Sequence, residues 1–116
     1  MNGFIEDIYQ KHGFIYRIGE KFYALGADIF AEVTDTAEID NIELFQNAVK
    51  KNNERQISKY LDKIIRIANS YRVDAKEHLK LQAKLAAFME ELEQQDIERY
   101  QALQKQVFEF DELFTR

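Results

Sequence analysis

The final third of the chain carries its longest amphipathic pattern. Residues 74–114 contain no Gly and no Pro, and apolar residues recur there at the spacing of one helical face. The residues on this face are Leu81, Leu85, Phe88, Met89, Leu92, Leu103, Val107, Phe110 and Phe114. Asp74, followed three residues later by Glu77, is typical of a helix start. We therefore predict one helix over residues 74–114. Where the apolar face is interrupted, Asp96 and Arg99 either pair along the helix or simply face water.

A single helix of this length is too long for a compact domain. At ~1.5 Å per residue it extends about 60 Å, whereas a domain of this size has a radius of gyration of roughly 13 Å. Either the helix bends near residues 93–96, or it projects and its apolar face needs a partner. Because no Gly, Pro or Asn marks a bend, we expect it to project, with dimerisation or a bound protein covering the apolar face. The predicted partner-binding residues are Leu92, Tyr100, Leu103, Val107, Phe110, Leu113 and Phe114. The alternative is that the terminal aromatic residues pack against the chain's own first helix.

The first third of the chain is open to two interpretations. Its apolar residues follow a seven-residue repeat, which predicts a helix from Gly3 to Val33 capped by Asn2. The repeat consists of Phe4, Ile8, Ile15, Ile18, Phe22, Leu25 and Ile29. Three glycines oppose it, each by about 1 kcal/mol relative to Ala. The competing interpretation is a β-hairpin at residues 14–25, with the strands FIYRI and KFYAL joined by a turn at Gly19-Glu20. We favour the helix, because the repeat continues through both strands.

The middle third predicts two shorter helices. Asp35 and Asn53 are each followed three residues later by Glu or Gln, the pattern of a helix N-cap. The apolar spacing that follows predicts helices over residues 37–51 and 54–72. Since the break between them is too short to span a helix length, the two helices form an antiparallel pair.

These elements predict an all-α fold. We expect a four-helix up-down arrangement over residues 1–116 as a single domain, with long N- and C-terminal helices and a short central antiparallel pair. An α+β fold with a hairpin at residues 14–25 is the alternative.

Composition narrows the class of protein. The chain has 116 residues, a formal net charge of −5, no Cys and no Pro. Without Cys, neither a disulfide framework nor a thiolate metal site is available. No apolar run approaches the ~20 residues of a membrane span, and the opening MNGFIEDIYQ lacks the pattern of a secretory signal. We therefore expect a soluble cytoplasmic protein. The charge disfavours nucleic-acid binding and suits a basic protein partner.

No motif in the sequence fixes a chemistry. The chain has two histidines, and neither has a Glu three residues before it, so the signature of carboxylate di-iron bundles is absent. Asp74 and His78 are one helical turn apart, but two ligands do not make a metal site. A Gly-rich phosphate loop and a Ser-centred nucleophile motif are also absent. An acidic cluster spreads around the predicted helix and is interpreted as a solvated face. Its members are Glu90, Glu91, Glu93, Asp96 and Glu98. We expect no cofactor and no metal.

One spacing resembles a known family. Arg72, five residues and then His78 are similar to the Arg-x(4–6)-His motif of the HEPN superfamily, small all-α bundles that include ribonuclease toxins. The resemblance implies that Arg72 would hold a phosphate and that His78 would act in acid/base cleavage of RNA, with two copies meeting across a dimer. Here Val73 follows the Arg, where the family commonly has a polar residue.

Taken together, these patterns favour a non-enzymatic helical protein-protein interaction module. We expect an adaptor, an export-chaperone-like protein or a small acidic inhibitor of the immunity type, which forms a homodimer and binds a protein partner through an amphipathic helical face. The alternative function is the HEPN-like ribonuclease that uses Arg72 and His78.

Overall fold

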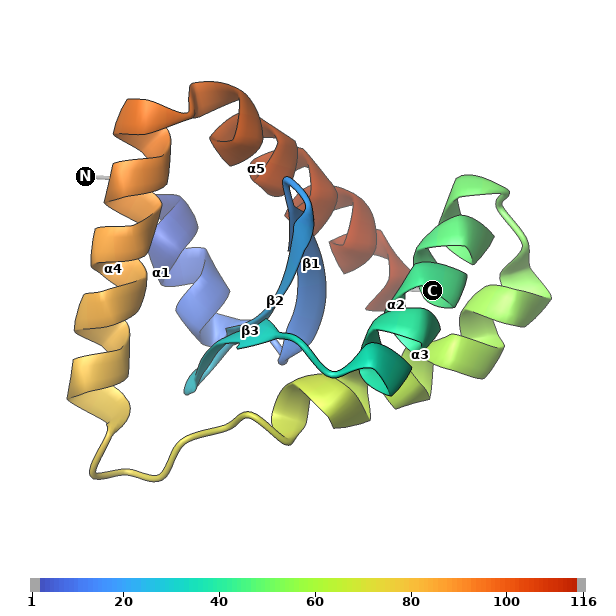
Figure 1. The fold of residues 1–116 in the computed structure, drawn as a ribbon, viewed down its shortest axis with the longest axis horizontal. Coiled ribbons are helices and arrows are strands. Elements are labelled where there is room, and N and C mark those ends of the chain that lie inside the picture. Colours follow the sequence, from blue (N-terminus) through green and yellow to red (C-terminus); the bar gives the residue numbers. More distant parts are fainter. Residues whose placement is uncertain (1–2, 115–116) are drawn as a thin grey trace.

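The computed structural model describes residues 3–114 and the side chains of residues 3–113. Over this range the chain forms an antiparallel sheet surrounded by helices (Figure 1). The elements are α1 (Gly3–Gln10), β1 (Phe14–Ile18), β2 (Lys21–Gly26), β3 (Ile29–Val33), α2 (Thr36–Lys50), α3 (Glu54–Asn69), α4 (His78–Gln95), α5 (Ile97–Asp111) and the 3₁₀ turn η1 (Glu112–Phe114). The fold is therefore α+β, and the predicted all-α four-helix arrangement is wrong.

The first third forms α1 and a three-stranded sheet in the order β1-β2-β3, so the predicted helix from Gly3 to Val33 is wrong beyond α1. The competing hairpin at residues 14–25 is confirmed. Ile18 pairs with Lys21 across Gly19-Glu20, and Gly19 has φ +65°, which a two-residue turn with Gly at its first central position requires. The predicted cap Asn2 lies outside the described residues.

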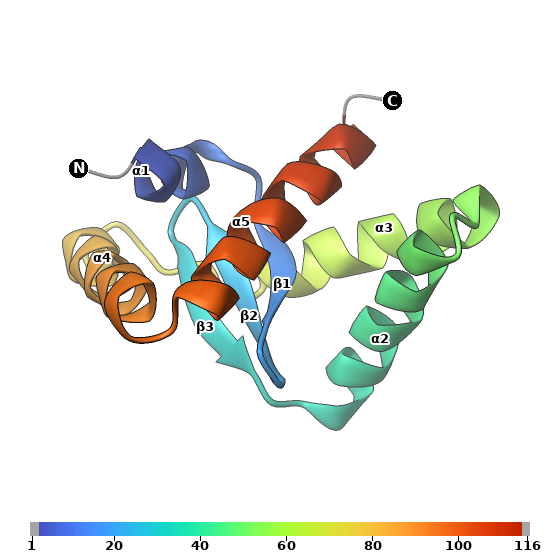
Figure 2. The ribbon, with the colours of Figure 1, turned by 90° about the horizontal axis from the view of Figure 1, so that it is seen from above.

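The helices are arranged around the sheet so that each strand has its own cover. Helices α3 and α5 both pack on β1, α1 packs on β2, and α4 packs on β3 (Figure 1, Figure 2). The ring of Phe14 on β1 lies 5.4 Å from that of Phe45 on α2 and 5.5 Å from that of Phe110 on α5. All three side chains are buried, so this aromatic cluster joins β1 of the sheet to helices α2 and α5.

The central helix pair is confirmed. Helices α2 and α3 pack against each other and begin at the predicted caps. The Asp35 carboxylate accepts a hydrogen bond from the Glu38 amide at 2.9 Å, and the Asn53 side-chain oxygen accepts one from the Gln56 amide at 3.2 Å. The tight reversal between the two helices places Asn52 at φ +53°.

The predicted continuous helix over residues 74–114 is wrong. Helix α4 begins at His78, because the Asp74 carboxylate accepts from the Lys76 amide in a preceding turn. The chain breaks again at Asp96, which leaves helical geometry with φ −148° and ψ 71° and caps α5 by accepting from the Arg99 amide. The Asp96–Arg99 pair does form, at 3.2 Å. The bend returns α5 over the sheet, and the radius of gyration is 13.8 Å.

Candidate protein-interaction edge

Most of the predicted partner-binding residues lie in the chain's own interior. Because the bend at Asp96 returns α5 onto β1, four of them are at most 4% exposed and belong to the core. These are Tyr100, Leu103, Val107 and Phe110. Leu92 and Leu113 are half-buried against the same core. The side chain of Phe114 is outside the described part of the chain. A partner that binds this fold without unfolding it therefore has little access to the four core side chains.

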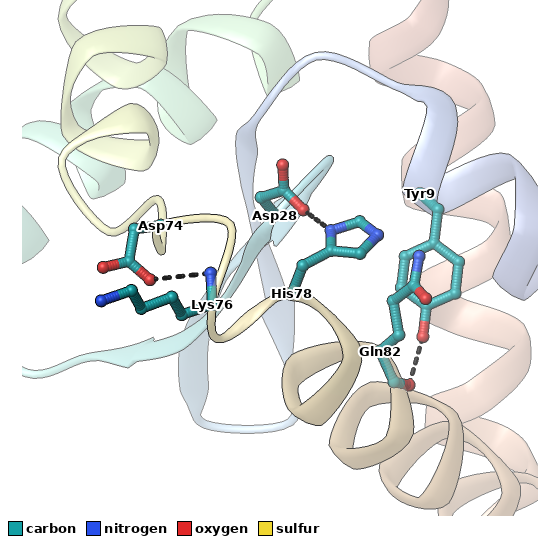
Figure 3. Close-up of polar contacts among 6 residues, drawn as sticks. All are labelled: Tyr9, Asp28, Asp74, Lys76, His78 and Gln82. Atoms are coloured by element: carbon teal, nitrogen blue, oxygen red, sulfur yellow. Dashed lines mark hydrogen bonds and ion pairs between the residues drawn. The ribbon is translucent and has the colours of Figure 1, made fainter.

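Arg72 and His78 each contact a different residue. The guanidinium of Arg72 donates to the Asn69 side-chain oxygen at 2.6 Å. His78 contacts the Asp28 carboxylate in the turn between β2 and β3 (Figure 3), and the backbone carbonyl of Asp28 accepts from the Val73 amide at 2.9 Å. These contacts fasten the α3–α4 loop to the sheet. The all-α bundle that the HEPN resemblance implies is not the fold observed.

Figure 3 also shows how the surrounding polar groups are used. The Tyr9 hydroxyl donates to the Gln82 backbone carbonyl and links α1 to α4, while Asp74 turns toward the Lys76 amide and away from His78. Burial raises the pKa of the Tyr9 hydroxyl, which keeps it protonated as a donor. Within residues 3–114, His, Asp and Glu side chains do not gather into any group of three that could hold a metal ion.

The β1 edge of the sheet is closed by a side chain. Because Ile18 and Lys21 close a two-residue hairpin, the backbone N–H and C=O of Arg17 point away from β2. The Gln106 amide on α5 takes both groups: its oxygen accepts from the Arg17 N–H at 2.8 Å, and its nitrogen donates to the Arg17 carbonyl at 2.8 Å. Gln46 on α2 donates to the same Gln106 oxygen at 3.2 Å. The Gln106 amide therefore substitutes for a neighbouring strand at Arg17. Ile15, the other β1 residue whose backbone groups point outward, is 1% exposed and so is covered by packing.

The β3 edge of the sheet is open. Gly26 and Ile29 form the closing pair of the second turn, so the backbone groups of Phe30 and Glu32 are the ones that point outward. Their N–H and C=O groups have no hydrogen-bond partner in the described part of the chain. Phe30 and Ala31 are half-buried and Glu32 is exposed. Unpaired edges of this kind are templates for pairing with another strand.

An aromatic cluster flanks the open edge. Phe30 contacts Phe88 on α4 with ring centroids 5.2 Å apart, and Tyr23 on β2 lies 5.1 Å from Phe88. All three rings are only partly buried. Tyr23, Phe30 and Glu32 project from the same face of the sheet, whereas Ala31 projects from the other. The edge thus offers hydrogen-bonding groups, an apolar platform and a carboxylate.

A groove with a volume of about 340 Å³ adjoins the end of β3. Its apolar lining comes from Phe22, Val33 and Ile39, and its charged and polar lining from Arg17, Glu20, Lys21, Glu32, Thr34 and Glu43. Lys21 pairs with Glu32 at 3.7 Å, and Arg17 donates to the Gly19 carbonyl while lying over the Phe22 ring. Neither Glu20 nor Glu43 forms an ion pair within residues 3–114. Three carboxylates and two cations therefore line the groove, which gives it a formal charge of −1.

Comparison of the chain with models of protein families, with curated proteins and with solved structures finds no match. Among the helices that the structure describes, none combines the length and apolar character needed to cross a membrane. The sequence pattern did not reveal the open edge, because which backbone groups face outward depends on strand register. The signals for the first two strands were the apolar segments FIYRI and KFYAL and the Gly19-Glu20 turn between them.

Proposed function

We propose that this chain is a non-enzymatic protein-interaction module that binds an extended segment of a partner at the β3 edge. The observation that supports the proposal is the difference between the two edges of the sheet. At the β1 edge, Gln106 takes both outward backbone groups of Arg17. At the β3 edge, the equivalent groups of Phe30 and Glu32 have no partner in the described chain. Strand addition is the recognition mode that such an edge supports.

A bound strand would gain affinity from two sources at this edge. The first is the outward N–H and C=O groups of Phe30 and Glu32, which can exchange hydrogen bonds with the backbone of the added strand. The second is the partly exposed ring pair of Phe30 and Phe88, on which an apolar side chain of the added strand can pack. Association through a helical face, which the sequence suggested, would not use either feature.

Proline scanning of β3 tests the proposal. In Glu32→Pro the lost N–H faces outward, so the strand's bonds to β2 remain and the edge alone loses a donor. Glu32→Gln is the matched control, since it also removes the carboxylate but keeps the N–H. Each tagged variant is used to capture proteins from the native host, and the captured proteins are quantified by mass spectrometry.

We expect Glu32→Gln to keep a specific set of captured proteins that Glu32→Pro loses, while circular dichroism shows both variants folded. Equal capture by the two folded variants would refute strand addition at this edge. Ala31→Pro is the control for damage to the sheet. The Ala31 N–H points toward β2, so its removal should lower the stability of the fold.

A further inference from the structure

The side chains around the β3 edge restrict the kind of segment that can bind there. In an added antiparallel strand, the residues opposite Phe30 and Glu32 lie on the same face of the sheet, two positions apart. The first of these meets the Phe30–Phe88 ring pair, and the second meets the Glu32 carboxylate. The residue between them lies beside Ala31, whose small side chain leaves room for a branched one.

The groove extends this selection past the end of β3. The residue of the added strand beside Val33 lies on the face that carries the groove, whose rim includes Glu20 and Glu43. Neither carboxylate has a cationic partner among the described residues. The chain as a whole carries a net charge of −5. A cationic side chain at this position therefore meets two carboxylates that have no cationic partner, in a groove whose own Arg17 guanidinium lies over the Phe22 ring.

Resting on the proposed function, we propose that the β3 edge binds a basic, extended protein segment. From its N-terminus to its C-terminus, this segment has two consecutive Lys or Arg residues, then a β-branched residue, then a large apolar residue. The basic pair lies opposite Val33 and Glu32, the β-branched residue opposite Ala31, and the apolar residue opposite Phe30.

A second copy of this chain is the competing occupant, and its charges fit less well. In a two-fold pairing centred on Ala31, Glu32 of one copy lies opposite Phe30 of the other, so each Glu32 gains no cation. The same pairing brings together two groove rims, each with a formal charge of −1. Repulsion between these rims favours a basic heterologous segment over self-pairing.

Two synthetic peptides test the proposal: acetyl-Thr-Lys-Lys-Val-Tyr-Thr-amide and its charge-reversed counterpart acetyl-Thr-Glu-Glu-Val-Tyr-Thr-amide. Each is titrated into the ¹⁵N-labelled chain. We expect the lysine peptide to shift the amide resonances of Phe30 and Glu32 and to bind about fivefold more tightly than the glutamate peptide, because two opposite-charge contacts replace two like-charge contacts. The double variant Glu32→Lys/Glu43→Lys should reverse the preference, and Glu91→Lys, an exposed change on α4, should preserve it.

The possible outcomes separate this inference from the proposed function. If both peptides bind equally at β3, the charge selection is wrong and strand addition stands. If neither peptide binds, or if the shifts fall elsewhere, the basic segment is refuted, and proline scanning then decides whether the edge binds any partner. A wild-type dimer by light scattering that Glu32→Pro converts to a monomer would assign the edge to a second copy and overturn the proposal.

Discussion

The side chain of Gln106 should contribute measurably to stability because it closes the β1 edge. Gln106→Ala removes the two hydrogen bonds to the Arg17 backbone, each 2.8 Å long, and the weaker contact with Gln46. A typical net contribution is about 0.5–1.5 kcal/mol per hydrogen bond. Since Arg17 is exposed, water can replace part of what is lost, which places each bond in the lower half of that range.

We therefore expect Gln106→Ala to lower the free energy of unfolding by about 1–2 kcal/mol. With an m-value of roughly 1–3 kcal/mol/M for a protein of this size in urea, the midpoint should fall by about 0.3–2 M. Urea unfolding followed by circular dichroism measures this shift. Gln101→Ala, an exposed change on the same helix, is the control and should move the midpoint little.

Amide hydrogen exchange gives a second, local readout of the same variant. The Arg17 N–H should exchange faster in Gln106→Ala. The uncovered β1 edge should also cause the variant to self-associate as its concentration rises. If the midpoint and the Arg17 exchange rate both match those of Gln101→Ala, Gln106 does not protect the edge. In that case the comparison between the two edges would lose its basis.

Two further predictions concern the polar contacts between distant segments. His78→Ala should lower the free energy of unfolding by roughly 1 kcal/mol and speed hydrogen exchange of the Val73 N–H, because the pairing of His78 with Asp28 fastens the α3–α4 loop to the sheet. Nuclear magnetic resonance measures the exchange rate. An unchanged rate would show that other contacts hold the loop. The hydrogen bond to Glu38, together with burial, raises the pKa of Tyr71 to about 12 from about 10 in the unfolded chain. The stabilisation by this hydrogen bond is therefore complete below about pH 10 and is lost as the pH rises toward 12. The difference in tyrosinate absorbance between wild type and Tyr71→Phe measures this pKa, and Glu38→Gln should lower it; no change in that variant would contradict the assigned cause.

The central helix pair could be predicted because local signals decide it. The caps at Asp35 and Asn53 bond to the amides three residues ahead, as their side chains predict, and the apolar spacing agrees with them. Such contacts involve neighbours in sequence, so they depend little on the rest of the fold. The ends of these helices differ from the prediction by one to three residues.

The first third could not be predicted from periodicity because both faces of the sheet are covered. Ile15 and Phe22 project from one face, whereas Ile18 and Leu25 project from the other, and all four are buried. A strand covered on both faces reads as a nearly continuous apolar run, which can also match a seven-residue helical repeat. The glycine at position 19 carried the better signal, because its turn needs a positive φ.

Glu32 explains how an open edge can remain unpaired until a suitable partner arrives. A short strand with a charge next to its last residue is a poor template for another copy of itself, which limits edge-to-edge association. The same carboxylate is already paired with Lys21, but at 3.7 Å and with both side chains largely exposed, such a pair contributes only about 0–1 kcal/mol. A cation on an added strand, held in register by backbone hydrogen bonds, can displace Lys21 at little cost. Unwanted pairing and selective binding are thus controlled by one side chain, which makes Glu32 the position where charge and backbone effects on binding are best separated.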